Sequence, residues 1–183
     1  MLALIALADG FEEVEAVTIV DVLRRGGVQA ELVSINGTTS VRGAHGVTME
    51  SDLRWEEIAS RLDAYDAIVL PGGGEGTNRL KTDPRVLAAV REFDRTHRFV
   101  CAICAAPTVL AAAGLLAGRQ ATCYPSCAPE LGDSYSEAPV VTDDNIITGS
   151  GPGTATIFSL VLLMHFTDES VARQVADGML ADF

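Results

Sequence analysis

The pattern of apolar residues constrains the fold of this chain more than any other feature. Short apolar runs bounded by Gly, Pro or Asp alternate with longer stretches in which apolar residues recur at helical spacing. Such alternation is typical of a mainly parallel sheet with helices packed on both faces. We therefore predict a doubly wound α/β fold, a three-layer sandwich with strands near 2–8, 28–35, 66–70 and 99–103 and helices near 11–25, 84–96 and 106–118.

Further segments complete the predicted sandwich. Residues 41–52 resemble a small hairpin that turns at His45 and Gly46, and residues 139–151 resemble a second hairpin. Additional helices are expected near 55–62, 154–166 and 169–181. The chain has no repeat, linker or low-complexity tract, and its 183 residues suit one substantial core. We expect a single domain over residues 1–183.

Charge excludes one class of function. The 25 acidic and 13 basic residues give a formal charge of -12, which repels phosphate backbones, and no basic stripe offsets it. Nucleic-acid binding driven by bulk charge is therefore not expected. The N-terminal run lacks the basic region of a signal peptide, and no apolar stretch reaches membrane-spanning length. We expect a soluble, cytoplasmic protein that does not bind membranes.

Cys104 is the first candidate for chemistry. It follows a predicted buried strand at the point where the chain turns into a helix, and the small residues Ala105 and Ala106 beside it permit a tight bend. This arrangement is typical of a nucleophile elbow, and a helix N-terminus favours the reactive thiolate. The alternative is a small buried hydrophobic residue, which a free cysteine usually is.

Glycines and carboxylates supply further candidates. The PGGGEG loop allows close backbone approach, so Gly72 and Gly73 can direct an amide at an oxyanion formed at Cys104. The loop does not fit the G-x-G-x-x-G pattern of dinucleotide binding in either register. Of the three glutamates in FEEVEA, Glu12 and Glu13 are expected in a solvated helix start, whereas Glu15 lies on the inward arc and could exchange protons. His45 could reach the same site.

The four cysteines leave two other interpretations open. The CAIC and CYPSC pairs outline a four-cysteine zinc site, and Cys104 could form a disulfide with Cys123 or Cys127 under oxidation. Cys101 falls within a predicted buried strand and Cys104 precedes a helix, which disfavours zinc. We expect no metal and no cofactor.

Six segments, in order, carry a resemblance to a known family. The chain resembles the ThiJ/PfpI superfamily, in the branch of the parkinsonism-associated protein deglycase and its bacterial relatives, through ADGFEEVEAV, VDVLRRGG, GAHGVTMESD, DAIVLPGGGEGTNRL, AICAAPTVLAAAGLL and ITGSGPGTA. The resemblance covers almost the whole chain. It implies a flavodoxin-like homodimer in which Cys104 is reactive and easily oxidised to sulfinate, Glu15 hydrogen-bonds it, and the amides of Gly73 and Ala105 form the oxyanion site.

The resemblance also implies activities. These are a cofactor-independent glyoxalase that converts methylglyoxal to lactate through a hemithioacetal, and a deglycase acting on early glyoxal adducts of proteins and nucleotides. The alternative is an oxidative-stress sensor or chaperone that oxidises Cys104 without turnover. Ala105 stands where peptidase members have histidine, which argues against a Cys-His protease. Tyr124 stands where human-like members have histidine, and His45 matches a position where relatives carry His or Arg. Tyr124, His45 and Gly72 of the glycine loop are the expected substrate-site residues.

Overall fold

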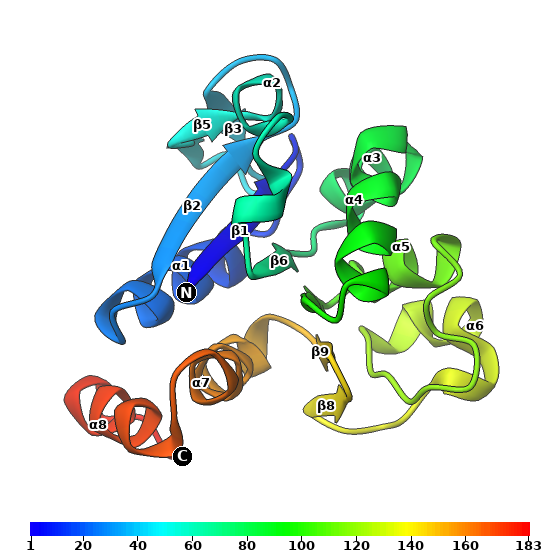
Figure 1. Cartoon of the computed structure of the whole chain (residues 1–183). Coiled ribbons are helices and arrows are strands. Elements are labelled where there is room, and N and C mark those ends of the chain that lie inside the picture. Colours follow the sequence, from blue (N-terminus) through cyan, green and yellow to red (C-terminus); the bar gives the residue numbers. More distant parts are fainter.

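The computed structural model describes all residues from 1 to 183 and contains a seven-stranded sheet in the order β5-β2-β1-β6-β7-β9-β8 (Figure 1). All neighbouring strands are parallel except β8 and β9, which form the predicted second hairpin. The strands are β1 (Leu2–Leu7), β2 (Gln29–Ser34), β5 (Leu53–Arg54), β6 (Ala67–Leu70), β7 (Phe99–Ile103), β8 (Val140–Asp143) and β9 (Ile146–Gly149). The first predicted hairpin forms a separate two-stranded sheet from β3 (Ser40–Arg42) and β4 (Thr48–Glu50).

Helices cover both faces of this sheet, which confirms the three-layer prediction. One core joins the sheet to α1 (Glu13–Arg25), α7 (Ala155–Phe166) and α8 (Glu169–Met179). The other joins it to α2 (Trp55–Ile58), α3 (Gly74–Thr82), α4 (Pro84–Arg95), α5 (Pro107–Ala112) and α6 (Ala128–Leu131) (Figure 1). Short 3₁₀ turns lie at Leu62–Ala64, Pro125–Cys127, Gly132–Ser134 and Pro152–Thr154.

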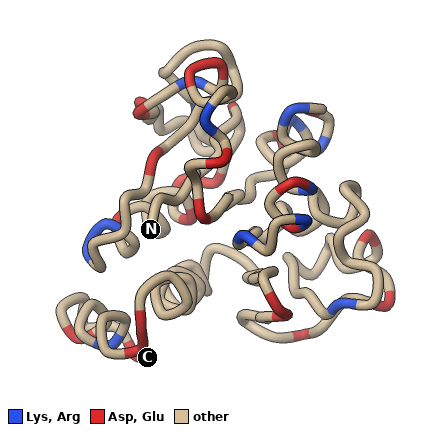
Figure 2. The backbone as a smooth tube through the Cα atoms, viewed as in Figure 1, with Lys and Arg blue, Asp and Glu red and all other residues tan.

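Strand β1 shows why the apolar runs predict this architecture. Successive side chains of a strand point to opposite faces. Ala3, Ile5 and Leu7 belong to the core with α1, whereas Leu4 and Ala6 belong to the core with α4. Strands β1, β6, β7 and β9 contain no Lys, Arg, Asp or Glu. In Figure 2 the charged residues lie mainly on the helices and loops around them. Both faces of the central strands are therefore apolar because both are covered.

Two helices differ from the sequence prediction. The helix expected over 106–118 is limited to Pro107–Ala112, and Gly114 follows with a positive φ of 79°. Helix α3 starts inside the glycine-rich loop, where no helix was expected because glycine is a weak helix former. No helix of the chain has both the length and the apolarity needed to cross a bilayer.

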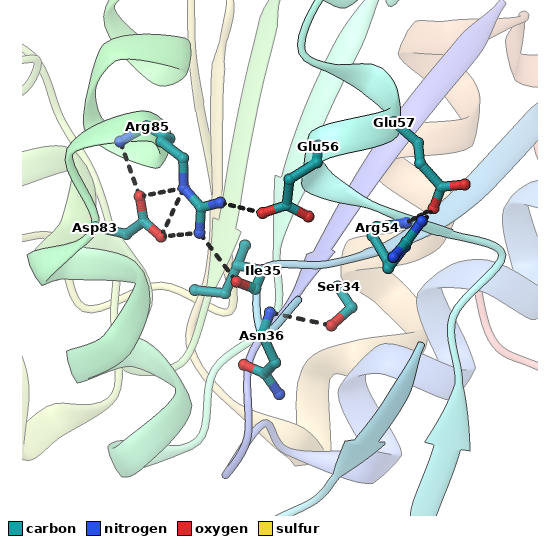
Figure 3. A network of polar contacts seen from close by, with 8 residues as sticks. All are labelled: Ser34, Ile35, Asn36, Arg54, Glu56, Glu57, Asp83 and Arg85. Carbon is teal, nitrogen blue, oxygen red and sulfur yellow. Dashed lines mark hydrogen bonds and ion pairs between the residues drawn. The ribbon is translucent and has the colours of Figure 1, made fainter. Parts of the chain in front are cut away.

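A polar network fixes the start of α4 against the second strand (Figure 3). The Arg85 guanidinium donates to Glu56 of α2 at 2.6 Å, to the Ile35 carbonyl at 2.9 Å and to Asp83 at 2.7 Å. Asp83 also caps α4 by accepting from the Arg85 backbone N–H at 2.8 Å. The network joins α2, α4 and the end of β2, and none of these hydrogen bonds involves Cys104.

Candidate active site

The candidate residues converge at the carboxyl ends of three neighbouring strands. Glu15 lies in α1, which follows β1, while Gly72 follows β6 and Cys104 follows β7. The helices that follow β1 and β6 cover opposite faces of the sheet, so the strand connections diverge between these two strands. In open α/β sheets, ligands bind in the crevice at such a switch point.

Cys104 occupies a strained turn. Its φ of 64° lies in the left-handed region, which a residue other than glycine enters at a cost of about 1–3 kcal/mol. Two backbone hydrogen bonds hold this turn: the Cys104 N–H donates to the Gly149 carbonyl at 2.9 Å, and the Cys104 carbonyl accepts from the Tyr124 N–H at 2.8 Å. Cys104 is 8% exposed. This sharp, stabilised bend is the backbone geometry of a nucleophile elbow.

Glu15 is a completely buried carboxyl group beside this cysteine. Its Oε2 accepts a hydrogen bond from the Gly72 N–H at 2.7 Å, whereas its Oε1 is buried without a conventional partner. Burial raises the pKa of Glu15 to about 7, against the opposing effects of the Gly72 amide and the Cys104 thiol. Glu15 can therefore carry a proton at neutral pH, which an ordinary glutamate cannot.

The same environment disfavours the thiolate form of Cys104. Burial, followed by the charge of Glu15, raises the pKa of Cys104 to about 12, and the amides of Ala105 and Gly73 only partly offset this. Burial and the charge of Glu15 therefore outweigh the expected stabilisation of a thiolate by a helix N-terminus. Helix α5 begins at Pro107. The two side chains compete for one proton, so the thiolate forms most readily when Glu15 holds that proton.

The glycine loop makes this close pairing possible. A Cβ on Gly72 would lie 2.7 Å from Cys104 Cβ and 2.8 Å from Glu15 Oε2, so Gly72 leaves the space through which the two side chains meet. Gly73 has a φ of 92°, and a Cβ there would lie 2.2 Å from the Gly10 carbonyl oxygen. The backbone amides of Gly73 and Ala105 lie beside the sulfur of Cys104. The loop sequence indicated Gly73, whereas only the family resemblance implied Ala105.

The His45 side chain pairs with Glu13 and not with the cysteine elbow. Its Nδ1 lies 2.8 Å from Glu13 Oε2, and its side chain is 73% exposed. The Glu13 hydrogen bond raises the pKa of His45. His45 therefore pairs with Glu13 and forms no hydrogen bond with Cys104 or Glu15. Tyr124 is closer to the elbow through its backbone, and its half-exposed ring packs near Gly151.

Glu12 and Glu13 are not solvated, so the expectation for them was wrong. Both are buried, and Glu12 is the N-cap of α1, where its Oε2 accepts from the Glu15 N–H at 2.8 Å. Glu13 accepts hydrogen bonds from the His45 and Val47 backbone N–H groups and thereby fixes the β3–β4 turn to α1. The glutamate spacing in E-x-x-E, similar to a capping box, is the sequence signal that could have indicated the cap.

The four cysteines do not form a common site. All are free thiols; Cys101 and Cys104 belong to the core beneath α1, whereas Cys123 and Cys127 pack in the core on the opposite face. Burial raises the pKa of Cys101 above its ordinary range. One set of three possible metal-ligating residues does converge, because donor atoms of Glu12, Glu13 and His45 lie within 4.8 Å of one another. The hydrogen bonds above account for that set.

The fold and these residues define a class: a flavodoxin-like α/β protein with an elbow cysteine paired to a buried carboxyl group at the sheet's switch point. A family model described as DJ-1/PfpI family matches residues 1–165. The chain belongs to the DJ-1/PfpI family, as the resemblance predicted.

Individual relatives cover nearly the whole chain. Protein dj-1beta of Drosophila melanogaster is 38% identical over 99% of this chain and 97% of its own length. A Schizosaccharomyces pombe protein named glutathione-independent glyoxalase DJ-1 is 34% identical over 86% of each chain. The structure of oxidised Toxoplasma gondii DJ-1 is similar with a TM-score of 0.95 and 31% identity, covering 100% of this chain and 99% of that one.

Proposed function

We propose that this protein is a cysteine-dependent, cofactor-independent glyoxalase that converts methylglyoxal to lactate. The observation that carries the proposal is the Cys104 thiol beside the buried Glu15 carboxyl group, with the Gly73 and Ala105 amides at the sulfur. These groups supply a nucleophile, a proton carrier and an oxyanion site, the three parts that the reaction needs. The name of the S. pombe relative, a glutathione-independent glyoxalase, supports the same reaction class.

The proposed reaction uses one thiol and one carboxyl group. The Cys104 thiolate attacks the aldehyde carbon, and the hemithioacetal oxygen accepts hydrogen bonds from the Gly73 and Ala105 amides. Glu15 gives the proton that it holds to the hemithioacetal oxygen and, now a carboxylate, removes the proton from the former aldehyde carbon and returns it to the neighbouring carbon. It then moves the hydroxyl proton from the first oxygen to the oxygen of the neighbouring carbon. The product is an S-lactoyl thioester, which water hydrolyses to lactate and free Cys104. Each proton removed is replaced, so the cycle needs no external oxidant or reductant.

The presence of Tyr124 at the site limits which residue can act as the base. A tyrosine cannot act as a base near neutral pH, but its hydroxyl can donate a hydrogen bond. In this proposal Glu15 therefore carries every proton transfer, and Tyr124 contributes at most a donor to the bound substrate. Early glyoxal adducts of amines and thiols are a second substrate class, because the same attack at their carbinol carbon releases the amine or thiol.

Lactate formation from methylglyoxal tests the proposal. Reduced wild-type protein should form lactate, whereas Cys104→Ser and Glu15→Ala should lose at least about 100-fold in rate. Cys127→Ser is the matched cysteine control and should keep the wild-type rate. A rate of lactate formation by wild type no higher than that of Cys104→Ser would contradict the proposal. A deglycase assay needs a non-enzymatic aldehyde scavenger as its control, because removal of free methylglyoxal mimics repair of adducts.

A second candidate function is oxidation sensing. The buried Glu15 Oε1 has no conventional partner and could donate its proton to an oxidised Cys104, and a related structure is described as oxidised. In this alternative two peroxide molecules convert Cys104 to sulfinate, with release of two waters. Mild peroxide should then add two oxygens to Cys104 in wild type but fewer in Glu15→Ala. Mass spectra without that addition exclude the sensor.

We also propose a cytoplasmic homodimer. The four free cysteines suit a reducing compartment. Val14 and Val17 of α1 and Val47 of the β3–β4 turn are large apolar residues that are each about half exposed. The turn is fixed to α1 by Glu13, so these valines belong to one anchored region that a second copy could cover. Sedimentation should show a dimer for wild type and monomer for Val17→Asp; monomeric wild-type protein contradicts this assembly.

A further inference from the structure

Glu12 makes contacts that go beyond those of an ordinary helix cap. Its carboxylate accepts from the Glu15 N–H at 2.8 Å, and its own N–H donates to the Gly72 carbonyl at 3.0 Å. The Gly72 N–H in turn donates to the Glu15 carboxyl group at 2.7 Å. These three hydrogen bonds form a closed ring that joins the start of α1 to the glycine loop. The ring fixes the Glu15 backbone and side chain together.

The ring also places two carboxyl groups near each other in a buried region. Glu12 is 8% exposed, and no lysine or arginine forms an ion pair with it. From the β3–β4 turn, His45 Nδ1 lies 4.0 Å from Glu12 Oε1 and is the cation that faces it when protonated. Glu15 is faced by Glu12, the N-cap of α1, and by Cys104 after β7. The negative charge of Glu12 adds to burial in raising the pKa of Glu15.

We propose that Glu12 is a positioning residue for the Cys104–Glu15 pair. Its cap bond holds Glu15 in place, and its buried charge favours the protonated Glu15 that leaves the thiolate on Cys104. The inference rests on the proposed role of Glu15 as the proton carrier. Glu12 does not need to touch the substrate, because it acts entirely through Glu15.

The test separates the charge of Glu12 from its cap. Glu12→Gln keeps a carbonyl acceptor for the Glu15 N–H but removes the charge, whereas Glu12→Ala removes both. Asp168→Asn is the matched control, because Asp168 caps α8 through the Val171 N–H at 3.0 Å, far from Cys104 in sequence and on another element. The readouts are the thermal midpoint and the pH dependence of Cys104 alkylation by iodoacetamide, located by mass spectrometry.

Glu12→Gln should move the pH midpoint of alkylation down by roughly 0.5 unit at a nearly unchanged thermal midpoint. Glu12→Ala should move both midpoints down, and Asp168→Asn should leave the alkylation midpoint unchanged. Repeating the comparison in a His45→Gln background excludes the titration of His45 as the source of the shift. A Glu12→Gln midpoint equal to that of wild type would overturn the inference. Alkylation needs no turnover, so a failed glyoxalase assay and a failed Glu12 role give different results.

Discussion

Replacing Glu15 by glutamine should change how stability depends on pH. Glutamine keeps an oxygen that can accept from the Gly72 N–H, but it cannot ionise. The pKa of Glu15 is raised from 4.5 to about 7 in the folded protein, chiefly by burial. One pKa unit corresponds to about 1.36 kcal/mol, so ionised Glu15 lowers the free energy of unfolding by roughly 3 kcal/mol.

The direction follows from proton binding. Between the unfolded and folded pKa values of Glu15, the folded protein binds this proton more tightly than the unfolded chain does. The stabilisation is therefore complete below about pH 4.5 and is lost as the pH rises through about 7. Relative to wild type, Glu15→Gln should gain up to about 3 kcal/mol between these limits.

Urea unfolding of both proteins at several pH values measures this difference. Other titrating groups contribute to both curves, so the difference between the curves isolates Glu15. The difference should be constant below about pH 4.5, increase toward about pH 7 and level off above it. Two parallel curves would show that Glu15 titrates like an exposed glutamate, and the proton-carrier role would then have no physical basis.

Three further outcomes are expected. Alkylation of Cys104 should rise with a midpoint near pH 7 in wild type, because the pair loses its first proton there and some molecules then hold the thiolate beside protonated Glu15. Glu15→Gln should abolish that step, and an unchanged midpoint refutes the pairing. Gly73→Ala should lower the free energy of unfolding by about 2 kcal/mol more than Gly27→Ala, because both need positive φ but only Gly73 contacts neighbouring backbone; equal losses in urea unfolding contradict this. Arg85→Ala should lower the thermal midpoint by several degrees through loss of its bonds to Glu56 and Ile35, while Cys104 alkylation stays at the wild-type rate; altered alkylation would link that network to the site.

The fold could be predicted because its signals are local. The central strands are apolar on both faces, and alternate residues of β1 pack into the cores on opposite faces of the sheet. The start of α3 could not be predicted, because its glycines have weak helix propensity and tertiary contacts override it. The early end of α5 follows from positive φ at Gly114, which a glycine permits but does not require.

The candidate site was predictable in part. Cys104, Glu15, Gly73 and Ala105 do converge, and the family resemblance as well as the turn context indicated them. The proton balance of the pair was not predictable, because it depends on complete burial of Glu15 next to the thiol. The roles of Glu12 and Glu13 were missed because α1 begins at Glu13, two residues later than predicted, which makes Glu12 the N-cap, and because Glu13 accepts hydrogen bonds from a turn that is distant in sequence.

The most direct test of the proposed chemistry follows Cys104 during turnover. Reduced protein is mixed with methylglyoxal and quenched in acid at successive times, and the modified cysteine is located by tandem mass spectrometry while lactate is measured in the same samples. Cys104 should carry an S-lactoyl group that hydroxylamine removes, that precedes lactate and that disappears when the substrate is exhausted. Lactate that accumulates while Cys104 stays unmodified, with Cys104→Ser equally active, would contradict a reaction at this thiol.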